Sequence, residues 1–179
     1  MSVSQQHIRR AWKALEKYTP MRKDCGVICA SACCKGEADI GMRLVPGEKA
    51  LLTSDDFTLK TGESGEFCVC SGYCQRHLRP LACRIFPYFP IPIQLRSGRY
   101  AIRTMPDARA LGVCPLLRNE TVEIDRRFLH AVHRAGWKLL KSRRTRAWLL
   151  ESAEEIQLTA QLQTRLQDSA DTAVPAHSN

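Results

Sequence analysis

Four of the nine cysteines in the chain lie within ten residues, at Cys25, Cys29, Cys33 and Cys34. Thiolate sulfur is a preferred ligand of zinc and of iron–sulfur clusters, and neither centre is normally held by fewer than three protein ligands. Five further thiols follow in the sequence, namely Cys68, Cys70, Cys74, Cys83 and Cys114. Nine cysteines could therefore complete two four-ligand sites with one cysteine left over.

Disulfide bonds would use the same residues, and two observations count against them. The first thirty residues lack the apolar segment of a secretory signal peptide, and the number of cysteines is odd. We therefore expect a cytoplasmic protein whose thiols stay reduced, which favours metal binding or redox chemistry. No run approaches eighteen apolar residues, so we predict no membrane span.

The composition indicates one core and an anionic partner. A chain of 179 residues with 44% hydrophobic content can bury roughly 70% of its unfolded surface, so metal would supplement an existing core. The formal charge of +9 suggests nucleic acid, an acidic protein or an anionic surface without choosing among them.

Local patterns predict an α+β fold, in which a small, irregular, cysteine-rich core with short strands precedes a C-terminal helical extension. Ser2 and Gln5 have capping-box spacing at the start of a helix over 2–17. Short strands are predicted at 42–45, 57–60 and 67–69, a short helix at 46–52, and a hairpin with strands 91–96 and 99–104. Asp125 can cap a further helix, in which Phe128, Val132, Ala135 and Leu139 repeat at helical spacing.

A second C-terminal helix is expected from near Arg146, with Leu158, Leu162 and Leu166 as its later apolar stripe. The composition after residue 167 predicts a disordered tail. The chain thus divides into an N-terminal helix that packs on the domain (1–24), a cysteine-cluster domain (25–118), a basic helical extension (119–167) and a tail (168–179).

The spacing of the cysteines suggests how they could meet. If residues 25–34 were helical, Cys25, Cys29 and Cys33 would share one face. Cys68 and Cys70 are two residues apart on a predicted strand, so both sulfurs point to the same side of the sheet. Either both bind metal, or one binds metal and the other is a packed thiol.

The second half of the pattern is specific. Cys68-Val69-Cys70-Ser71-Gly72-Tyr73-Cys74 is followed by Arg79-Pro80-Leu81-Ala82-Cys83-Arg84-Ile85-Phe86-Pro87, and later by Cys114-Pro115. Together with the first cysteine group, this arrangement resembles the YkgJ-type cysteine-cluster family, which is described as a zinc- or iron-chelating domain. The resemblance covers about half the chain and extends to the cysteine-cluster region of flagellin lysine methylase. It implies that all nine cysteines are candidate ligands, with Cys114 the least certain.

Arg79 and Arg84 flank Cys83 and are the candidate cofactor-contacting cations. A centre built on four thiolates carries negative charge, which arginine can offset by donating hydrogen bonds toward sulfur. The alternative is an ordinary surface ion pair with a carboxylate such as Glu66.

The strongest basic run lies between Arg126 and Arg146, where no acidic residue occurs. With Trp137 and Trp148 interleaved, it could follow a phosphate backbone and stack bases. A solvated helix with both tryptophans in the core explains the same residues, and we favour that interpretation over nucleic-acid binding.

No phosphate-binding loop, dinucleotide fingerprint, nucleophile elbow or His-Glu-x-x-His motif is present, so the sequence assigns no reaction. Three functions remain: a metal-binding protein with an unknown protein partner, an iron–sulfur enzyme or electron carrier, and a zinc-stabilised nucleic-acid binder. The number of thiols favours an iron–sulfur cluster slightly over zinc.

Overall fold

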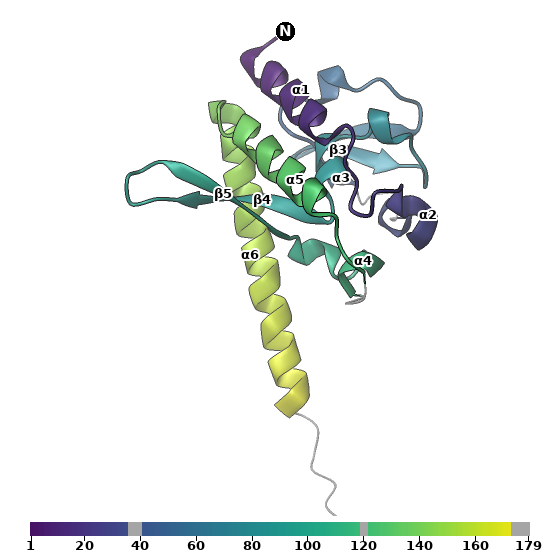
Figure 1. The fold of residues 1–179 in the computed structure, drawn as a ribbon, viewed down its shortest axis with the longest axis vertical. Helices are drawn as coiled ribbons and strands as arrows, with labels where there is room; N and C mark the ends of the chain where they lie inside the picture. The colour runs from purple at the N-terminus through teal and green to yellow at the C-terminus, as the bar shows by residue number, and fades with distance from the viewer. Residues whose placement is uncertain (36–40, 119–121, 173–179) are drawn as a thin grey trace, which may run out of the picture.

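The computed structural model describes residues 1–35, 41–118 and 122–172, and it shows the expected α+β fold. Helices α1 (Val3–Leu15), α5 (Arg126–Leu139) and α6 (Arg143–Thr172) pack with a hairpin of strands β4 (Tyr88–Gln94) and β5 (Tyr100–Pro106). We call this part the helical body. Residues 24–35 and 41–85 form the cysteine lobe beside it (Figure 1). The hairpin, which the sequence places in the cysteine-cluster region, thus packs with the C-terminal helices.

Helix α1 has the predicted capping box. The Ser2 hydroxyl accepts a hydrogen bond from the Gln5 amide at 3.3 Å, and the Gln5 side chain accepts one from the Ser2 amide at 2.8 Å. Its apolar face buries Ile8, Ala11 and Leu15. This face packs mainly against α5, which runs alongside α1 in Figure 1.

Helix α5 begins at the predicted cap, where the Asp125 side chain accepts from the Arg127 amide. The residues predicted to share its apolar face are buried, at Phe128, Val132, Ala135 and Leu139. Gly136 lets α5 approach the hairpin closely, because a Cβ atom there would lie 2.6 Å from the Cβ of Pro90.

The hairpin pairs Tyr88 with Pro106 at one end and Gln94 with Tyr100 at the other. Its turn uses Gly98 at φ +76°, a conformation that glycine adopts without strain. Both strands have a free edge, so Pro90 and Pro92 can lie within β4 without breaking a sheet. Because Pro90 is tolerated in such a strand, β4 starts at Tyr88, three residues before the predicted strand at 91–96.

Helix α6 begins three residues before Arg146 and continues to Thr172. The predicted disorder is therefore wrong for 168–172, because no glycine or proline interrupts the sequence from Arg143 to Thr172. Residues 173–179 lie outside the described residues. The first half of α6 buries Trp148, Leu149, Ala153 and Ile156, whereas the predicted stripe of Leu158, Leu162 and Leu166 is exposed.

The cysteine lobe contains a small antiparallel sheet of order β1-β3-β2, formed by β1 (Met42–Arg43), β2 (Phe57–Gly62) and β3 (Gly65–Cys70). All three strands were predicted, although β1 is shorter because Leu44 and Val45 turn into the core. The predicted helix at 46–52 is a single 3-10 turn, η2 (Lys49–Leu51). In the described parts of the chain, no helix is long and apolar enough to cross a membrane.

The remaining short helices carry or flank cysteines. They are α2 (Cys25–Cys29), η1 (Ala32–Cys34), η3 (Arg76–Leu78), α3 (Leu81–Ile85), η4 (Ala108–Ala110) and α4 (Pro115–Arg118).

Candidate metal centre

The first four cysteines do not lie on one helix. The Asp24 side chain caps α2 through the Gly26 amide at 3.1 Å, but α2 ends at Cys29. Ala30 and Ser31 both adopt the left-handed conformation, with φ of 49° and 56°, and η1 then begins at Ala32. The conditional prediction of one face for Cys25, Cys29 and Cys33 is therefore wrong, because two consecutive left-handed residues redirect the chain.

The loop after β3 positions the next thiols. Cys70 ends β3, and Gly72 at φ +105° turns the chain toward Cys74. Asp56 holds this loop from β2's side: its carbonyl oxygen accepts from the Ser71 hydroxyl at 3.0 Å, and its carboxylate accepts from the Gln75 amide at 3.1 Å. The sequence interpretation missed Asp56, because no local pattern connects residues so far apart.

Three sulfurs converge as a result. The Sγ atoms of Cys34, Cys70 and Cys74 all lie within 4.8 Å of one another. Cys74 is buried, whereas Cys34 and Cys70 are half-buried. We call these residues the thiol triad; their sulfurs are close enough to share one metal ion.

Cys68 and Cys83 lie next to the triad. Burial raises the pKa of Cys68 to about 12, and the nearby Cys70 and Cys74 add to the effect. Burial also raises the pKa of Cys83, with further contributions from Cys68, Cys74 and Cys34. Cys68 packs with Leu44 and Phe57, so of the strand pair Cys68 and Cys70 only Cys70 belongs to the triad.

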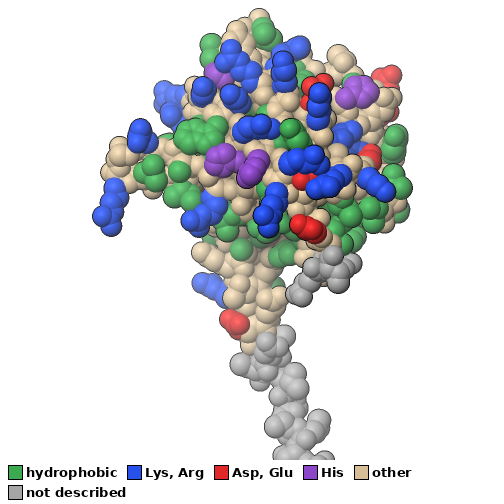
Figure 2. All heavy atoms as spheres, in the orientation of Figure 1, with side chains coloured by type: hydrophobic (Ala, Val, Ile, Leu, Met, Phe, Trp, Pro, Cys, Tyr) green, Lys and Arg blue, Asp and Glu red, His purple; other side chains and the backbone are tan. Residues whose placement is uncertain are grey.

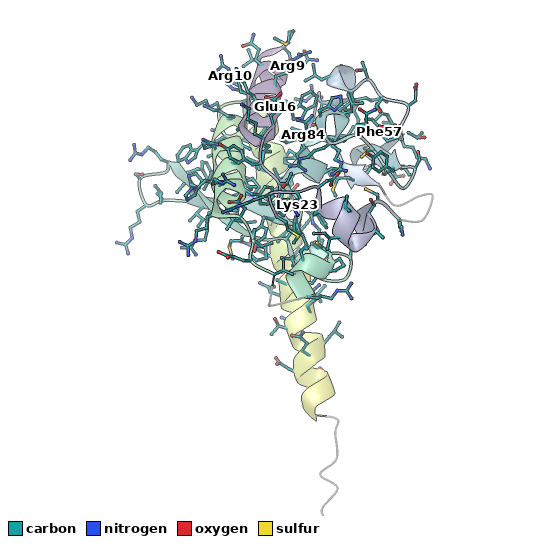
Figure 3. The ribbon with its side chains drawn as sticks, turned by 45° about the vertical axis from the view of Figure 1, so that its right-hand side comes forward. Arg9, Arg10, Glu16, Lys23, Phe57 and Arg84 are labelled. Carbon is teal, nitrogen blue, oxygen red and sulfur yellow. The ribbon has the colours of Figure 1, made fainter. Side chains whose placement is uncertain are left out.

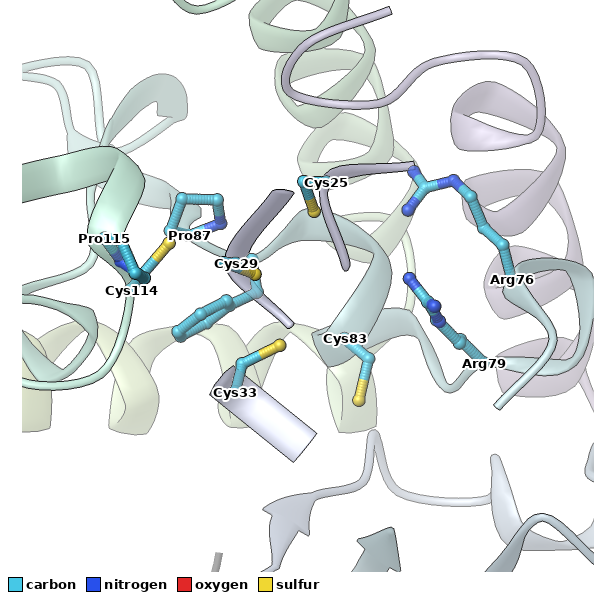
Figure 4. Close-up of a pocket in the computed structure, with 10 residues that line it drawn as sticks. Cys25, Cys29, Cys33, Arg76, Arg79, Cys83, Pro87, Cys114 and Pro115 are labelled. Carbon is cyan, nitrogen blue, oxygen red and sulfur yellow. The ribbon is translucent and has the colours of Figure 1, made fainter. Parts of the chain in front are cut away.

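A second group of thiols surrounds a small cavity of about 20 Å³. Cys25, Cys29, Cys33, Cys83 and Cys114 line it, and Figure 4 shows their sulfurs around a common space. The sulfurs of Cys33 and Cys34 are 3.9 Å apart, so Cys33 joins this second thiol group to the triad. Eight of the nine cysteines thus form two adjoining groups, and Cys68 packs beside the triad.

Arg79 lies between the two groups and is buried, with 7% of its surface exposed. It donates a hydrogen bond to the Cys74 carbonyl at 3.0 Å and lies 3.5 Å from the Asp24 carboxylate. Burial by itself lowers its pKa, but hydrogen bonding and charge interaction with Cys74 raise the pKa of Arg79 overall. This geometry places the charge of Arg79 beside Cys74, and its predicted role of offsetting thiolate charge stays a prediction.

Arg84 contacts other groups. It donates to the carbonyl oxygens of Arg79 at 2.7 Å and His77 at 2.6 Å, and its guanidinium lies 4.9 Å from the centre of the Trp12 ring. These contacts, rather than hydrogen bonds to sulfur, account for its burial. In Figure 3 Arg84 lies where α1 meets the cysteine lobe.

Glu48 completes that junction and was missed by the sequence interpretation. Its carboxylate is fully buried and accepts hydrogen bonds from the Trp12 indole at 2.8 Å, the Val45 amide at 3.0 Å and the Leu81 amide at 2.6 Å. Burial raises its pKa, whereas the three hydrogen bonds and Arg84 lower it. Glu48 therefore ties α1 to the start of α3, the helix that carries Cys83.

The triad thiols hold their protons tightly in the absence of metal. A hydrogen bond with Cys33, supported by burial, raises the pKa of Cys34 to about 12. A hydrogen bond with Cys34 and burial raise the pKa of Cys74 as well. Metal binding would therefore release protons, and metal affinity would increase with pH.

The predicted basic run lies elsewhere, on the helical body. Two of its residues, Lys138 and Lys141, lie close to His7 and Arg10 of α1. Burial lowers the pKa of His7 most, and Arg10, Lys141 and Lys138 lower it further. Figure 2 shows lysine and arginine side chains across this face, around histidines. Trp148 is buried as the solvated-helix interpretation requires, but Trp137 is 42% exposed.

The fold and site together define an α+β protein with a thiolate-rich candidate metal centre. Comparison with protein-family models, curated proteins and solved structures found no match for this chain.

Proposed function

We propose that the chain is a metal-binding protein whose thiol triad holds a single zinc ion. The observation that carries the proposal is the convergence of the Cys34, Cys70 and Cys74 sulfurs within 4.8 Å. A tetrahedral zinc ion with bonds of about 2.3 Å holds its sulfurs about 3.8 Å apart. Cys68 and Cys83 are the nearest candidates for a fourth ligand.

We propose zinc as the metal, whereas the sequence slightly favoured an iron–sulfur cluster. The sequence preference rested on the number of thiols, but these sulfurs divide into two groups, so no one centre uses them all. The ligands of an iron–sulfur cluster bind different irons and therefore lie further apart than ligands of one ion. An iron–sulfur cluster is the alternative, and the second thiol group is where its wider spacing fits best. The resemblance to the YkgJ-type family supports both metals and belongs to the same proposal.

Anaerobic purification with elemental analysis and an absorption spectrum tests this proposal. We expect a colourless protein with about one zinc per chain, lowered by Cys34→Ser, Cys70→Ser or Cys74→Ser. Tyr73→Phe is the matched control, because Tyr73 is 65% exposed between two triad cysteines and its change leaves every sulfur in place. Brown protein with acid-labile sulfide would establish the iron–sulfur alternative, and metal content unchanged in all three serine variants would reject the triad.

Nucleic-acid binding is a second candidate function, supported by the face that α1 and α5 form together. In the described part of the chain, no carboxylate pairs with Arg10, Lys138 or Lys141, although these like charges lie close together around His7. A cluster of like charges repels itself and attracts a polyanion. Figure 3 shows Arg9 and Arg10 on α1, and the exposed Trp137 adds a stacking surface.

Fluorescence anisotropy with a labelled single-stranded RNA tests this second function at several salt concentrations. The triple variant Arg10→Gln, Lys138→Gln, Lys141→Gln should bind more weakly, and its salt slope should fall by about 0.7 for each lost phosphate contact. The control is Arg96→Gln, Arg99→Gln, Arg103→Gln on the exposed hairpin, which removes equal charge. Equal weakening by both triple variants, or no wild-type binding, would reject a specific face.

A further inference from the structure

The second half of α6 carries an apolar stripe that nothing covers in the described part of the chain. Leu158, Leu162 and Leu166 are 60%, 58% and 71% exposed, and their spacing of four residues places them in one row along the helix. Figure 1 shows this half of α6 extending beyond the helical body and the cysteine lobe. Neither the thiol triad nor the basic face of α1 and α5 uses these leucines.

A contact with η4 helps to fix which side of this half of α6 faces outward. The Gln163 side chain donates a hydrogen bond to the Ala108 carbonyl at 3.0 Å. Leu162, the preceding residue, points about 100° away from that contact around the helix axis. The stripe is therefore held away from the helical body by the packing of the rest of the helix.

The second half of α6 has little apolar packing of its own. Ile156 is the last residue of α6 in the large apolar cluster, whereas the helix continues to Thr172. Isolated helical segments shorter than roughly 12–15 residues are marginal in water, and packing of an apolar face supplies most of the stability of a helix in proteins. A partner that covers the three leucines would therefore stabilise this part of α6.

Charge and shape favour a second copy of the chain as that partner. Between residues 157 and 169 the only charged residues are Arg165 and Asp168, so two such segments can meet without net repulsion. The other residues of this segment are mostly glutamine and threonine, which give an acidic or a basic partner little to pair with. A row of leucines spaced by four residues also matches itself, because interdigitation of such rows at about −50° is the commonest packing of two helices.

We propose that two copies of the chain associate through this stripe and cross at Leu162 about a two-fold axis. In such a pair the same surface serves both copies, and Leu162 of one copy contacts Leu162 of the other. Three leucines from each copy make an interface below the roughly 1,200 Å² of stable complexes, so we expect a weak dimer with a Kd of about 10 µM. The association does not depend on the proposed metal.

Sedimentation velocity of the protein as purified, from about 1 to about 200 µM, tests the stripe. The triple variant Leu158→Gln, Leu162→Gln, Leu166→Gln should stay monomeric throughout, because glutamine removes the apolar surface but keeps a similar helix propensity. The matched control is Ala160→Gln, Thr164→Gln, at exposed positions on the other side of the helix, and it should dimerise like wild type. A monomeric wild type, or a triple variant that still dimerises, would overturn the proposal.

Charge exchange at Leu162 tests the two-fold crossing. Leu162→Lys and Leu162→Glu should each be monomeric, because like charges would meet at the axis. An equal mixture of the two should associate at least tenfold more tightly than either alone, whereas Thr164→Lys and Thr164→Glu should each dimerise without mixing. Far-ultraviolet circular dichroism establishes that the variants keep the helix content of wild type. A mixture that stays monomeric would reject the contact of Leu162 with its own counterpart.

Discussion

The helical body and the cysteine lobe are held together by different means. The helical body buries one large apolar cluster, to which α1, α5, α6 and the hairpin all contribute and which Val45 and the α3 residues of the lobe complete. The cysteine lobe has a small cluster of Leu44, Leu52, Phe57, Cys68 and Cys74, in which two of the five members are cysteines. The body is therefore stabilised by apolar burial, whereas the lobe has only a small apolar cluster of its own, so a metal bound by its thiols would add stability.

The boundary between the two regions combines apolar contacts, through Val45 and α3, with polar ones. Glu48, Trp12 and Arg84 join the lobe to α1, and Arg43 joins β1 to α6 through Glu151 and Glu155. Directional hydrogen bonds and ion pairs of this kind help to set the relative position of the two units, which also share the large apolar cluster through Val45 and α3. The thiol triad therefore owes its position to the helical body as well as to the lobe.

Metal removal should separate the two regions most strongly. A chelator under reducing conditions should lower hydrogen-exchange protection in β1–β3 at least about a hundredfold, about 3 kcal/mol, while α5 stays protected. The reason is that metal binding and folding are coupled where the apolar core is small. Simultaneous loss of protection in α5 would contradict this division.

Gly136→Ala should destabilise the helical body without affecting the metal. The new Cβ would lie 2.6 Å from the Pro90 Cβ and 3.2 Å from Ile102, which predicts a loss of about 1–3 kcal/mol and several degrees in Tm. Gly112→Ala is the control, because no atom lies within 4 Å of its added Cβ. Loss of zinc in Gly136→Ala would show that the two regions are less independent than we conclude.

Glu48→Gln tests the junction. The amide would direct an NH₂ group at a buried N–H donor, and we expect a loss of about 1–3 kcal/mol in the free energy of unfolding. Burial raises the pKa of Glu48 above its ordinary value of 4.5, so its stabilising contribution is complete below pH 4.5 and declines as the pH rises through the folded pKa. The stability advantage of wild type over Glu48→Gln should therefore shrink as the pH rises above 4.5 in denaturant titrations. An advantage that grows with pH would mean that the carboxylate is stabilised as the anion.

Ala30→Gly should have the smallest effect and the opposite sign. Ala30 has φ of 49°, which glycine adopts without the cost of roughly 1 kcal/mol that a side chain incurs. We expect a gain of about 1 kcal/mol with zinc content unchanged, measured by thermal unfolding and elemental analysis. Ala160→Gly, at an exposed position within α6, should instead lose about 0.5–1 kcal/mol. A loss in both variants would show that the turn after α2 is not strained.

Features governed by local sequence were largely predictable. The capping box at Ser2, the Asp125 cap, the buried face of α5 and the strands of the small sheet all follow from neighbouring residues. The end of α6 was predicted too early, because the polar composition after residue 167 also fits the unbroken run of helix-compatible residues that continues to Thr172. The left-handed pair Ala30–Ser31 had no local signal, since neither residue is glycine.

The sequence by itself determined which side chains could ligate a metal, because nine cysteines supply the sulfur ligands that soft metals prefer. Tertiary structure alone decided which sulfurs meet. Cys34 reaches Cys70 and Cys74 only because a helix break, a strand end and a loop held by Asp56 bring distant segments together. Tertiary structure likewise buries Trp148 and leaves Trp137 exposed. The reason is that the packing of α5 and α6 against other elements, and not residue type, sets which face of each helix is buried.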